Sequence, residues 1–576
     1  MTQLKLRSQR TVLGLLCGAL AACGGGSNLP PAAQTTPTKV EVEQIAPVVP
    51  TRQAPPAGTQ PREIHFPPIA RENTGSGLEV NTVALHGVPV VNIKLVIKAG
   101  SARDAKELPG TAQLVAQMLK EGTARRSSAK IAEAVDFLGA RLAIHNDEEQ
   151  ISIDIQALSE QLPDAMALIG EIATEPSFDE GELRKLKKRE LDRLSLMAQS
   201  PNFLARREFW KVLYGEHPYA HVDTTKEVIT RITRNDLLAF HKRYFAPNNA
   251  YLVVVGDVTQ EKVLESANKT FKTWITRQVS PADYPAPPTR GAREIVLVDR
   301  PESVQSVIYV GNLALARKDP DYVPLLVANQ VLGGSAASRM FMDLREKQSL
   351  TYGAYSDLDE GIVPVPFRAF AAVRNEVTAQ AMKAFFQHLD RISSEAAAEA
   401  ELADAKRLLV DSFPLHIETP GEIAGLVSEL RQYGFPDNYW DGFRAEIQAV
   451  TAQRALEAAK RYIRPDNSLV VVVGKAAAVK EALAPYGAVK VVDTEGKLVV
   501  STPAQLPSQT AVPSGPVLPP SAAAPGAPIP PPAALAPPAA PSGGPQTPAL
   551  TPPPAPASAV QPAQNPPKPE PPKDAK

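Results

Sequence analysis

The pattern of apolar and polar positions predicts strands and helices that follow one another in a recurring order. Residues 90–100 (VVNIKLVIKAG) form a predicted strand, and residues 151–158 (ISIDIQAL) alternate like a half-buried strand. Residues 128–140 and 179–197 are predicted helices. Strands followed by several helices and a further strand indicate an α+β domain.

The same pattern occurs a second time in the chain. Residues Tyr244–Gly256 align without a gap on Tyr462–Gly474, and every matched pair is 218 residues apart. Each copy predicts a helix with a threonine near its start, a Pro-Asn turn, and a buried valine-rich strand closed by glycine. The sequence therefore predicts two homologous α+β domains at residues 76–278 and 296–498, joined by a connector at 279–295.

Composition argues against a nucleic-acid partner and distinguishes the terminal segments from the two domains. The 576 residues suit two to four domains at roughly 150 residues each. Because 61 basic and 62 acidic residues nearly cancel, no charge imbalance attracts nucleic acid, and none is expected as a partner. Residues 23–75 and the Pro/Ala-rich residues 499–576 are predicted disordered tethers. The second is a spacer, a docking strand or a solubilising tail.

The N-terminus predicts export and lipid attachment. Basic residues precede a short apolar run that ends in Leu20-Ala-Ala-Cys23, so residues 1–22 are a predicted signal peptide. Cys23 is the predicted lipidation site of a bacterial lipoprotein, and the alternative is an incidental cysteine near another cleavage site. Gly24 after the cysteine favours the periplasmic face of the outer membrane, where the lipid would be the chain's membrane contact. The remaining Cys17 would leave with the signal, so no disulfide is expected.

Three blocks resemble the insulinase/pitrilysin-like zinc metallopeptidases, the inverzincins, in their two-domain form. They are AGSARD with GTAQLVAQMLKEGT, the block from LYGEHPYAH to VVVGDV, and LGGSAASRMFMDLREKQSLTYGAYS. The resemblance covers about residues 78–492 and implies two metallopeptidase-like α+β domains that form a substrate chamber. Active members carry H-x-x-E-H on a helix of the first domain, with a glutamate about 70 residues later as third zinc ligand.

In this chain the zinc motif is degenerate. Matched to the family frame, the two histidines fall on Gln113 and Gln117 and the catalytic glutamate falls on Ala116. A glutamine amide is a weak neutral ligand, and alanine offers no base, so no zinc is expected in this chain. The neighbouring Leu114, Val115, Met118 and Leu119 are expected to keep the helix packed in its domain.

Two further groups bear on a metal site. Glu190 falls at about the third-ligand position and is not expected to bind metal alone. The favoured alternative for it is a solvated helix charge beside Lys187 and Lys188. His217 and His221 form a close pair, but Pro218 argues against a regular helix there, and a structural role is expected.

The second half carries a motif with Arg345 and Tyr352 that resembles the arginine and tyrosine of the family's C-terminal domain. The resemblance implies that this pair reaches the substrate near the scissile bond. A guanidinium can donate to peptide carbonyls, and a phenol can donate to a developing oxyanion. The alternative is that Arg345 caps a helix C-terminus and Tyr352 packs in the core.

These features predict a non-catalytic, substrate-binding subunit of a heterodimeric zinc metalloendopeptidase at the bacterial envelope. The expected partners are a homologous subunit with an intact zinc motif, which would hold the zinc, and a peptide or unfolded protein substrate. The alternative is a peptidase-like scaffold or peptide-binding lipoprotein without a proteolytic role. An independent peptidase with unusual ligands is the least favoured hypothesis.

Overall fold

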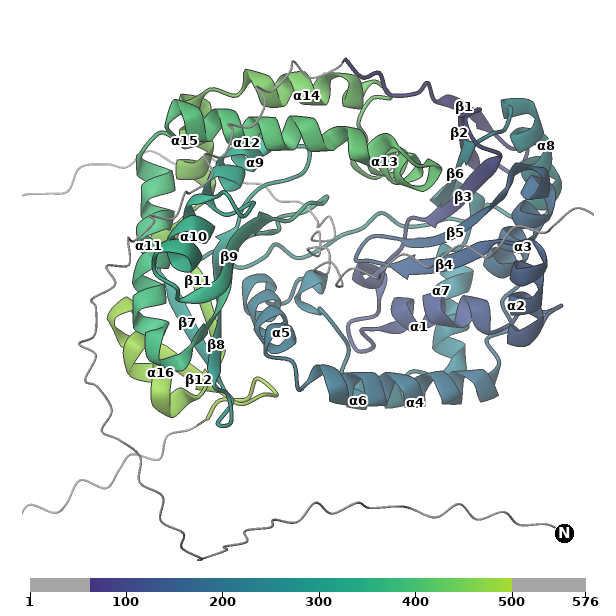
Figure 1. The fold of residues 1–576 in the computed structure, drawn as a ribbon. Coiled ribbons are helices and arrows are strands. Elements are labelled where there is room, and N and C mark those ends of the chain that lie inside the picture. Colours follow the sequence, from purple (N-terminus) through teal and green to yellow (C-terminus); the bar gives the residue numbers. More distant parts are fainter. Residues whose placement is uncertain (1–62, 500–576) are drawn as a thin grey trace, which may run out of the picture. The chain divides into compact units, whose positions relative to one another are not determined.

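The computed structural model describes residues 63–499, and within them the chain folds into two six-stranded sheets with helices packed against them (Figure 1). The predicted signal peptide, Cys23 and residues 500–576 of the predicted tail lie outside the described residues.

The first half contains one sheet and the helices that follow its strands. Its strands are β1 (Ala70–Asn73), β2 (Glu79–Ala84), β3 (Val90–Ile97), β4 (Arg141–Asn146), β5 (Ile151–Leu158) and β6 (Ala250–Gly256). Its helices are α1 (Thr111–Met118), α2 (Ser128–Phe137), α3 (Leu162–Thr174), α4 (Glu180–Met197), α5 (Pro201–Tyr214), α6 (Lys226–Arg231), α7 (Arg234–Tyr244) and α8 (Gln260–Thr270).

The second half repeats this plan after residues 271–293, which form no helix or strand. Its strands are β7 (Glu294–Asp299), β8 (Gln305–Leu313), β9 (Thr351–Leu358), β10 (Pro366–Arg374), β11 (Leu469–Gly474) and β12 (Val489–Val492). Its helices are α9 (Tyr322–Leu332), α10 (Arg339–Phe341), which continues into a π-helical segment (Met342–Lys347), α11 (Thr378–Ser394), α12 (Glu399–Ser412), α13 (Pro420–Tyr433), α14 (Tyr439–Ala449), α15 (Ala452–Tyr462) and α16 (Ala476–Leu483).

The two sheets share the order of five of their six strands, and their mixture of strands and helices confirms the predicted α+β fold class. Their strand orders are β1-β2-β6-β3-β5-β4 and β12-β7-β11-β8-β10-β9. In each sheet the valine-rich strand, β6 or β11, is parallel to one neighbour and antiparallel to the other. The sheets differ at one edge, where β1 runs antiparallel to β2 but β12 runs parallel to β7.

The predicted repeat corresponds to the central strand of each sheet and the helix before it. Thr233 and Thr451 cap α7 and α15, a 3-10 turn at Pro247–Asn249 or Pro465–Asn467 follows, and β6 and β11 are buried along their whole length. A strand covered on both faces needs the unbroken apolar run that both copies have. Gly256 ends β6 at a φ of 146°, where a Cβ atom would overlap the Val90 carbonyl oxygen.

The folded first half begins before the end of the predicted tether. Phe66 is buried, its N–H donates to Asp441 Oδ1 at 2.8 Å, and β1 starts at Ala70. The prediction that residues 23–75 are all tether is therefore wrong for its last residues. This segment has too few apolar residues to show a periodic pattern in the sequence. In the structure it is held by the buried Phe66 ring and by four residue pairs between β1 and β2.

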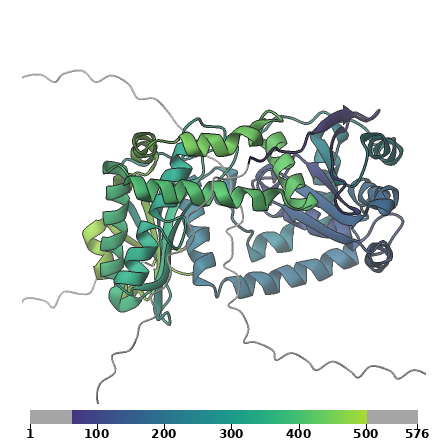
Figure 2. The same cartoon turned by 45° about the horizontal axis from the view of Figure 1, so that its top comes forward.

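Each half places one helix on the sheet of the other half. Helix α5 packs on β8 and β11, where Phe209 meets Tyr309 edge to face with ring centroids 5.9 Å apart. Helix α13 packs on β3 and β6, and the Tyr251 hydroxyl donates to the Ser428 carbonyl at 3.3 Å. Figures 1 and 2 show α5 beside the teal strands of the second sheet and α13 in green beside the purple and blue strands of the first. The hydrophobic cores of the two halves are joined by this exchange.

Within residues 63–499 the helices lack the combination of length and apolar character that a membrane crossing requires.

Candidate functional site

A cavity of about 770 Å³ lies between elements of the two halves. The first half contributes α1, the edge strand β4 with the turn after it, α5 and the loop at residues 219–224. The second half contributes Asp359, Glu360 and Val365 with Glu429, Gln432 and Tyr433 of α13. We call this cavity the chamber. Its wall includes Gln113, Ala116 and Gln117, the three positions of the degenerate zinc motif.

The start of α1 is fixed by a partly buried carboxyl group. Gly110 precedes the helix at a φ of 101°, and Asp104 accepts hydrogen bonds from the N–H groups of Gly110 at 2.6 Å and Ala112 at 2.8 Å. Burial raises the pKa of Asp104 to about 7, and these backbone donors oppose the rise. A Cβ atom at position 110 would lie 2.7 Å from Thr224 Cβ, so glycine also lets the loop at residues 219–224 approach α1.

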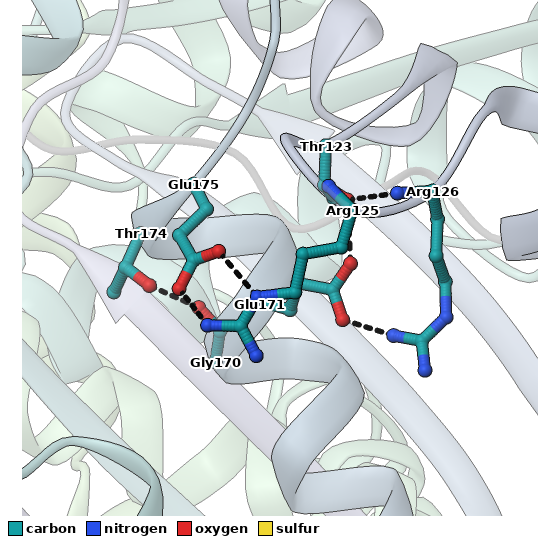
Figure 3. Close-up of polar contacts among 7 residues, drawn as sticks. All are labelled: Thr123, Arg125, Arg126, Gly170, Glu171, Thr174 and Glu175. Carbon is teal, nitrogen blue, oxygen red and sulfur yellow. Dashed lines mark hydrogen bonds and ion pairs between the residues drawn. The ribbon is translucent and has the colours of Figure 1, made fainter.

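The turn that follows α1 is joined by two ion pairs to α3 and to the residue directly after it (Figure 3). Thr123 and Arg126, in the turn after the helix, both bind the buried carboxylate of Glu171. Arg125 binds Glu175, and its Nε lies 2.7 Å from Glu175 Oε2. Leu114, Val115, Met118 and Leu119 are buried in the core of the first half, as predicted. The start of α1 and its apolar face are thus fixed by the fold, and the turn that follows it is tied to α3.

The structure brings the predicted third-ligand position to the degenerate motif. Glu190 on α4 accepts hydrogen bonds from Gln117 Nε2 at 3.1 Å and Gln113 Nε2 at 3.4 Å. Glu190 is only 5% exposed, so the prediction that it is a solvated helix charge is wrong. The charged residues 187–189 suggested a solvated segment, although position 190 lies on the buried face of α4.

An arginine that the sequence analysis did not single out completes this site. Arg193, one turn after Glu190, donates from Nε to Glu190 Oε2 at 2.7 Å. Its two terminal nitrogens donate to Asp223 at 2.8 and 2.9 Å. The hydrogen bonds to Asp223 raise the pKa of Arg193, so the guanidinium is a permanent charge. The i, i+3 spacing of Glu190 and Arg193 on a predicted helix could have indicated their contact. The contact between Arg193 and Asp223, which are 30 residues apart, had no such indication in the sequence.

These residues do not fit zinc. Gln113 and Gln117 direct their amide donors to Glu190, and a guanidinium already binds that carboxylate. Zinc sites need three protein ligands such as imidazole, thiolate or carboxylate. Within residues 63–499, no group of three or more His, Cys, Asp or Glu side chains is arranged to hold a metal ion.

His217 has a structural place, as predicted, whereas His221 is exposed and lines the chamber. His217 is buried, its Nδ1 accepts from the Tyr219 N–H at 3.1 Å, and its ring packs on Tyr219 and Tyr284. Burial lowers the pKa of His217 to about 4 and also lowers that of His221. A 3-10 turn at Pro218–Ala220 separates the two rings, so they do not stand one helical turn apart.

The chamber wall also holds carboxyl groups whose pKa is raised, and sequence analysis did not predict them. Burial and the charge of Glu148 raise the pKa of Asp147 to about 7. Burial and the charge of Glu360 raise the pKa of Glu429 to about 8, while Arg317 opposes the rise. Asp147 belongs to the first half and Glu429 to the second, so both halves contribute carboxyl groups that titrate near neutral pH.

Two buried acceptors and one sheet edge face the chamber. Among the described residues no donor reaches Gln117 Oε1 or Asn146 Oδ1, although both atoms are buried. Asn146 ends β4, which is the edge strand of the first sheet and has a paired strand on one side only. An edge strand can pair with an extended peptide, and unpaired buried acceptors are satisfied when a donor arrives.

Arg345 and Tyr352 do not line the chamber. Arg345 donates from Nη1 to the Tyr352 carbonyl at 2.9 Å and pairs with Glu346 at 3.1 Å. Its guanidinium thus joins the π-helical segment to the start of β9 and does not cap a helix. The Tyr352 side chain is 89% exposed, so the alternative that it packs in the core is also wrong. A role of this pair at a substrate stays a prediction.

The comparisons with known proteins agree with this architecture. Residues 80–211 match the family described as Insulinase (Peptidase family M16), and residues 231–409 match the one described as Peptidase M16 inactive domain. A protein of Streptomyces coelicolor named as an uncharacterized zinc protease is 22% identical over 410 residues, which are 70% of this chain and 89% of that protein. A similarly named protein of Mycobacterium tuberculosis is 24% identical over 352 residues, 60% of this chain and 80% of its own length.

Solved structures show the same fold. A peptidase M16 inactive domain from Pseudomonas fluorescens has a TM-score of 0.65 at 28% identity, covering 71% of this chain and 98% of that one. A protease from Helicobacter pylori has a TM-score of 0.68 at 20% identity, covering 71% of this chain and all of that one. Since the two family matches together span more than half of the sequence, this chain belongs to the insulinase family of peptidases, peptidase family M16.

Proposed function

We propose that this chain is the non-catalytic, substrate-binding subunit of a heterodimeric zinc metalloendopeptidase at the bacterial envelope. The observation that carries the proposal is the site on α1. The helix keeps the family's place against Glu190 and faces a chamber, yet its zinc-ligand positions are Gln113 and Gln117 and its base position is Ala116. Catalysis would therefore depend on zinc held by a homologous partner subunit.

Substrate binding is supported by the chamber wall. The free edge of β4 offers backbone donors and acceptors to an extended peptide. Gln117 Oε1 and Asn146 Oδ1 are buried acceptors that a peptide N–H would satisfy. The expected substrate class is an unfolded or extended peptide, because strand pairing reads backbone and not one side-chain sequence.

The exposed phenol of Tyr352 supports a shared active site. Tyr352 is 89% exposed, so its ring and hydroxyl are accessible to a second chain, where the hydroxyl could donate a hydrogen bond. Arg345 is the positioning residue in this arrangement, since it holds the Tyr352 carbonyl at the start of β9. The predicted lipid on Cys23 would hold the complex at the outer membrane, on its periplasmic face.

The test is to co-purify this chain with a homologous subunit that has an intact H-x-x-E-H motif, and to assay cleavage of unfolded peptides. We expect cleavage by the mixture and by neither protein when the other is absent. Tyr352→Phe should lower kcat/KM about 100- to 1000-fold if the phenol stabilises a developing oxyanion. Arg345→Ala should lower it as well by releasing Tyr352.

The matched control is Tyr355→Phe, three residues further along β9. Tyr355 packs against Phe341 and Phe370 in the second half, so loss of its hydroxyl should leave kcat/KM unchanged. If Tyr352→Phe and Tyr355→Phe behave alike, the shared active site is wrong.

A second candidate function is a peptide-binding lipoprotein without a proteolytic role. The unpaired acceptors and the free edge of β4 belong to this chain alone, so they favour binding that needs no partner. Fluorescence anisotropy with a labelled unfolded peptide distinguishes the two functions. Binding by the isolated chain, together with no cleavage in any mixture, would support the second function over the first.

A further inference from the structure

Arg193 has a position that the loss of zinc ligands does not by itself explain. It lies on α4 one turn after Glu190, and its Nε donates to the Glu190 carboxylate at 2.7 Å. Glu190 is also the acceptor for the amides of Gln113 and Gln117, which stand at the former histidine positions. The guanidinium is therefore bound to Glu190, the carboxylate at the predicted third-ligand position.

The other end of Arg193 is held as firmly. Nη1 and Nη2 donate to the two oxygens of Asp223 at 2.8 and 2.9 Å, and Asp223 also accepts from the Thr224 N–H at 2.8 Å. The side chains of Glu190 and Asp223 are only 6% and 7% exposed. A two-pronged bond of this kind fixes the direction of the guanidinium, so Arg193 cannot leave Glu190 without also breaking its bonds to Asp223.

The charges of this site follow from these contacts. The two buried carboxylates of Glu190 and Asp223 share one guanidinium, and both glutamines are neutral. Buried carboxylates need a counter-charge. In a zinc site the metal supplies it, whereas here Arg193 does.

We propose that Arg193 is the resident cation of this site: it replaces the charge of a divalent metal beside Glu190 and excludes metal even where histidine ligands are restored. The inference concerns the isolated chain and does not depend on a partner subunit. It separates two ways of losing zinc, the loss of ligands on α1 and the gain of a competing cation on α4.

The test measures zinc binding by isothermal titration of the full chain with Zn²⁺. The parent variant is Gln113→His with Gln117→His, which restores two imidazoles beside Glu190. Adding Arg193→Gln to this parent should tighten zinc binding about 10- to 100-fold, the range typical of outer-shell partners of a metal ligand. The matched control is Lys188→Gln in the same parent, because it removes one positive charge from an exposed position of the same helix.

Removal of Arg193 leaves two buried carboxylates without a counter-charge, and such a variant can lose its fold in the absence of metal. A second variant therefore adds Asp223→Asn, so that one positive and one negative group leave together. It should bind zinc more tightly than the parent by a similar factor. Circular dichroism of each variant without metal checks that the chain is folded.

Three results would overturn the inference. Equal zinc affinity of the Arg193→Gln and Lys188→Gln variants would show that Arg193 does not compete with metal. Tight binding by the parent variant, unchanged when Arg193 is replaced, would show that restored ligands suffice. About one zinc ion per unmodified chain after dialysis would show that no resident cation excludes metal.

Discussion

At the scale of single residues, the first half shows how guanidinium groups hold buried carboxylates in place. Glu190 is paired with Arg193, and Glu171 is paired with Arg126. Each of these carboxylates is buried and bound by a guanidinium and by at least one neutral donor. A buried carboxylate without such partners would be protonated or would destabilise the fold.

The two ion pairs of Figure 3 allow a matched comparison of burial. The Glu171 side chain is 7% exposed, whereas the Glu175 side chain is 33% exposed beside a mostly exposed Arg125. We expect Glu171→Gln to lower the free energy of unfolding by about 1.5 to 3 kcal/mol, because it weakens buried hydrogen bonds to a charged group. Glu175→Gln should cost less than about 1 kcal/mol. Urea unfolding followed by circular dichroism measures both, and equal losses would contradict the importance of burial here.

The degenerate motif could be located from sequence because its frame depends on local spacing. Gln113, Ala116 and Gln117 do face one cavity, and the apolar residues between them are buried. The burial of Glu190 was mispredicted, since its neighbours at 187–189 are charged and only packing against α1 decides which face is covered. Asp223 could not be predicted, because its bond to Arg193 joins a loop to a helix 30 residues earlier.

At the scale of elements, the repeat predicts the types and order of helices and strands but not which sheet a helix covers. Helix α5 begins with Ser200-Pro201 and ends before Gly215, and α13 begins with Thr419-Pro420 and ends before Gly434. These signatures mark α5 and α13 as equivalent elements. Amphipathic spacing predicts that one face of a helix is buried, but it does not predict whether the sheet that covers this face belongs to the same half. The exchange between halves is therefore visible only in the structure.

The exchange should make the two halves unfold as one unit. Phe209 on α5 is fully buried against the sheet of the second half, so Phe209→Ala should cost about 3 to 5 kcal/mol and lower both halves' stability together. The matched control is Phe137→Ala at the end of α2, where the ring is 89% exposed and its loss should change stability by no more than about 0.5 kcal/mol. Denaturant unfolding followed by tryptophan fluorescence and circular dichroism tests this.

Separate transitions of the unmodified chain would contradict the coupling of the halves. So would a Phe209→Ala variant in which only the first half, from which α5 comes, loses stability. The spectroscopic probes report on different parts of the chain, since Trp210 lies on α5, Trp274 in the first half and Trp440 on α14. Coincident transitions for all probes are the expected result.

At the scale of the whole molecule, the two halves jointly build a chamber whose wall carries carboxyl groups with raised pKa values. Asp104 and Asp147 have a pKa of about 7, against an ordinary value of 3.8, and Glu429 has a pKa of about 8, against 4.5. These groups come from three separate segments of the chain. The charge of the chamber therefore changes near neutral pH, and any cationic group of a bound peptide would meet a more negative wall as the pH rises.

The same shifts fix the sign of a pH effect on stability. A carboxyl group whose pKa is raised by folding stabilises the folded state below its unfolded pKa, and that contribution is lost as the pH rises through its folded pKa. For Glu429 the window runs from about pH 4.5 to about pH 8. One unit of pKa shift corresponds to about 1.4 kcal/mol, so even part of this shift gives a measurable slope. Glu429→Gln should therefore reduce the fall in the free energy of unfolding between pH 5 and pH 8. The matched control is Glu418→Gln, at an exposed position just before α13, which should leave that fall unchanged. Urea unfolding of the three proteins at several pH values measures how steeply the free energy of unfolding falls with pH. If the Glu429→Gln variant falls as steeply as the unmodified chain, ionisation of Glu429 does not oppose folding.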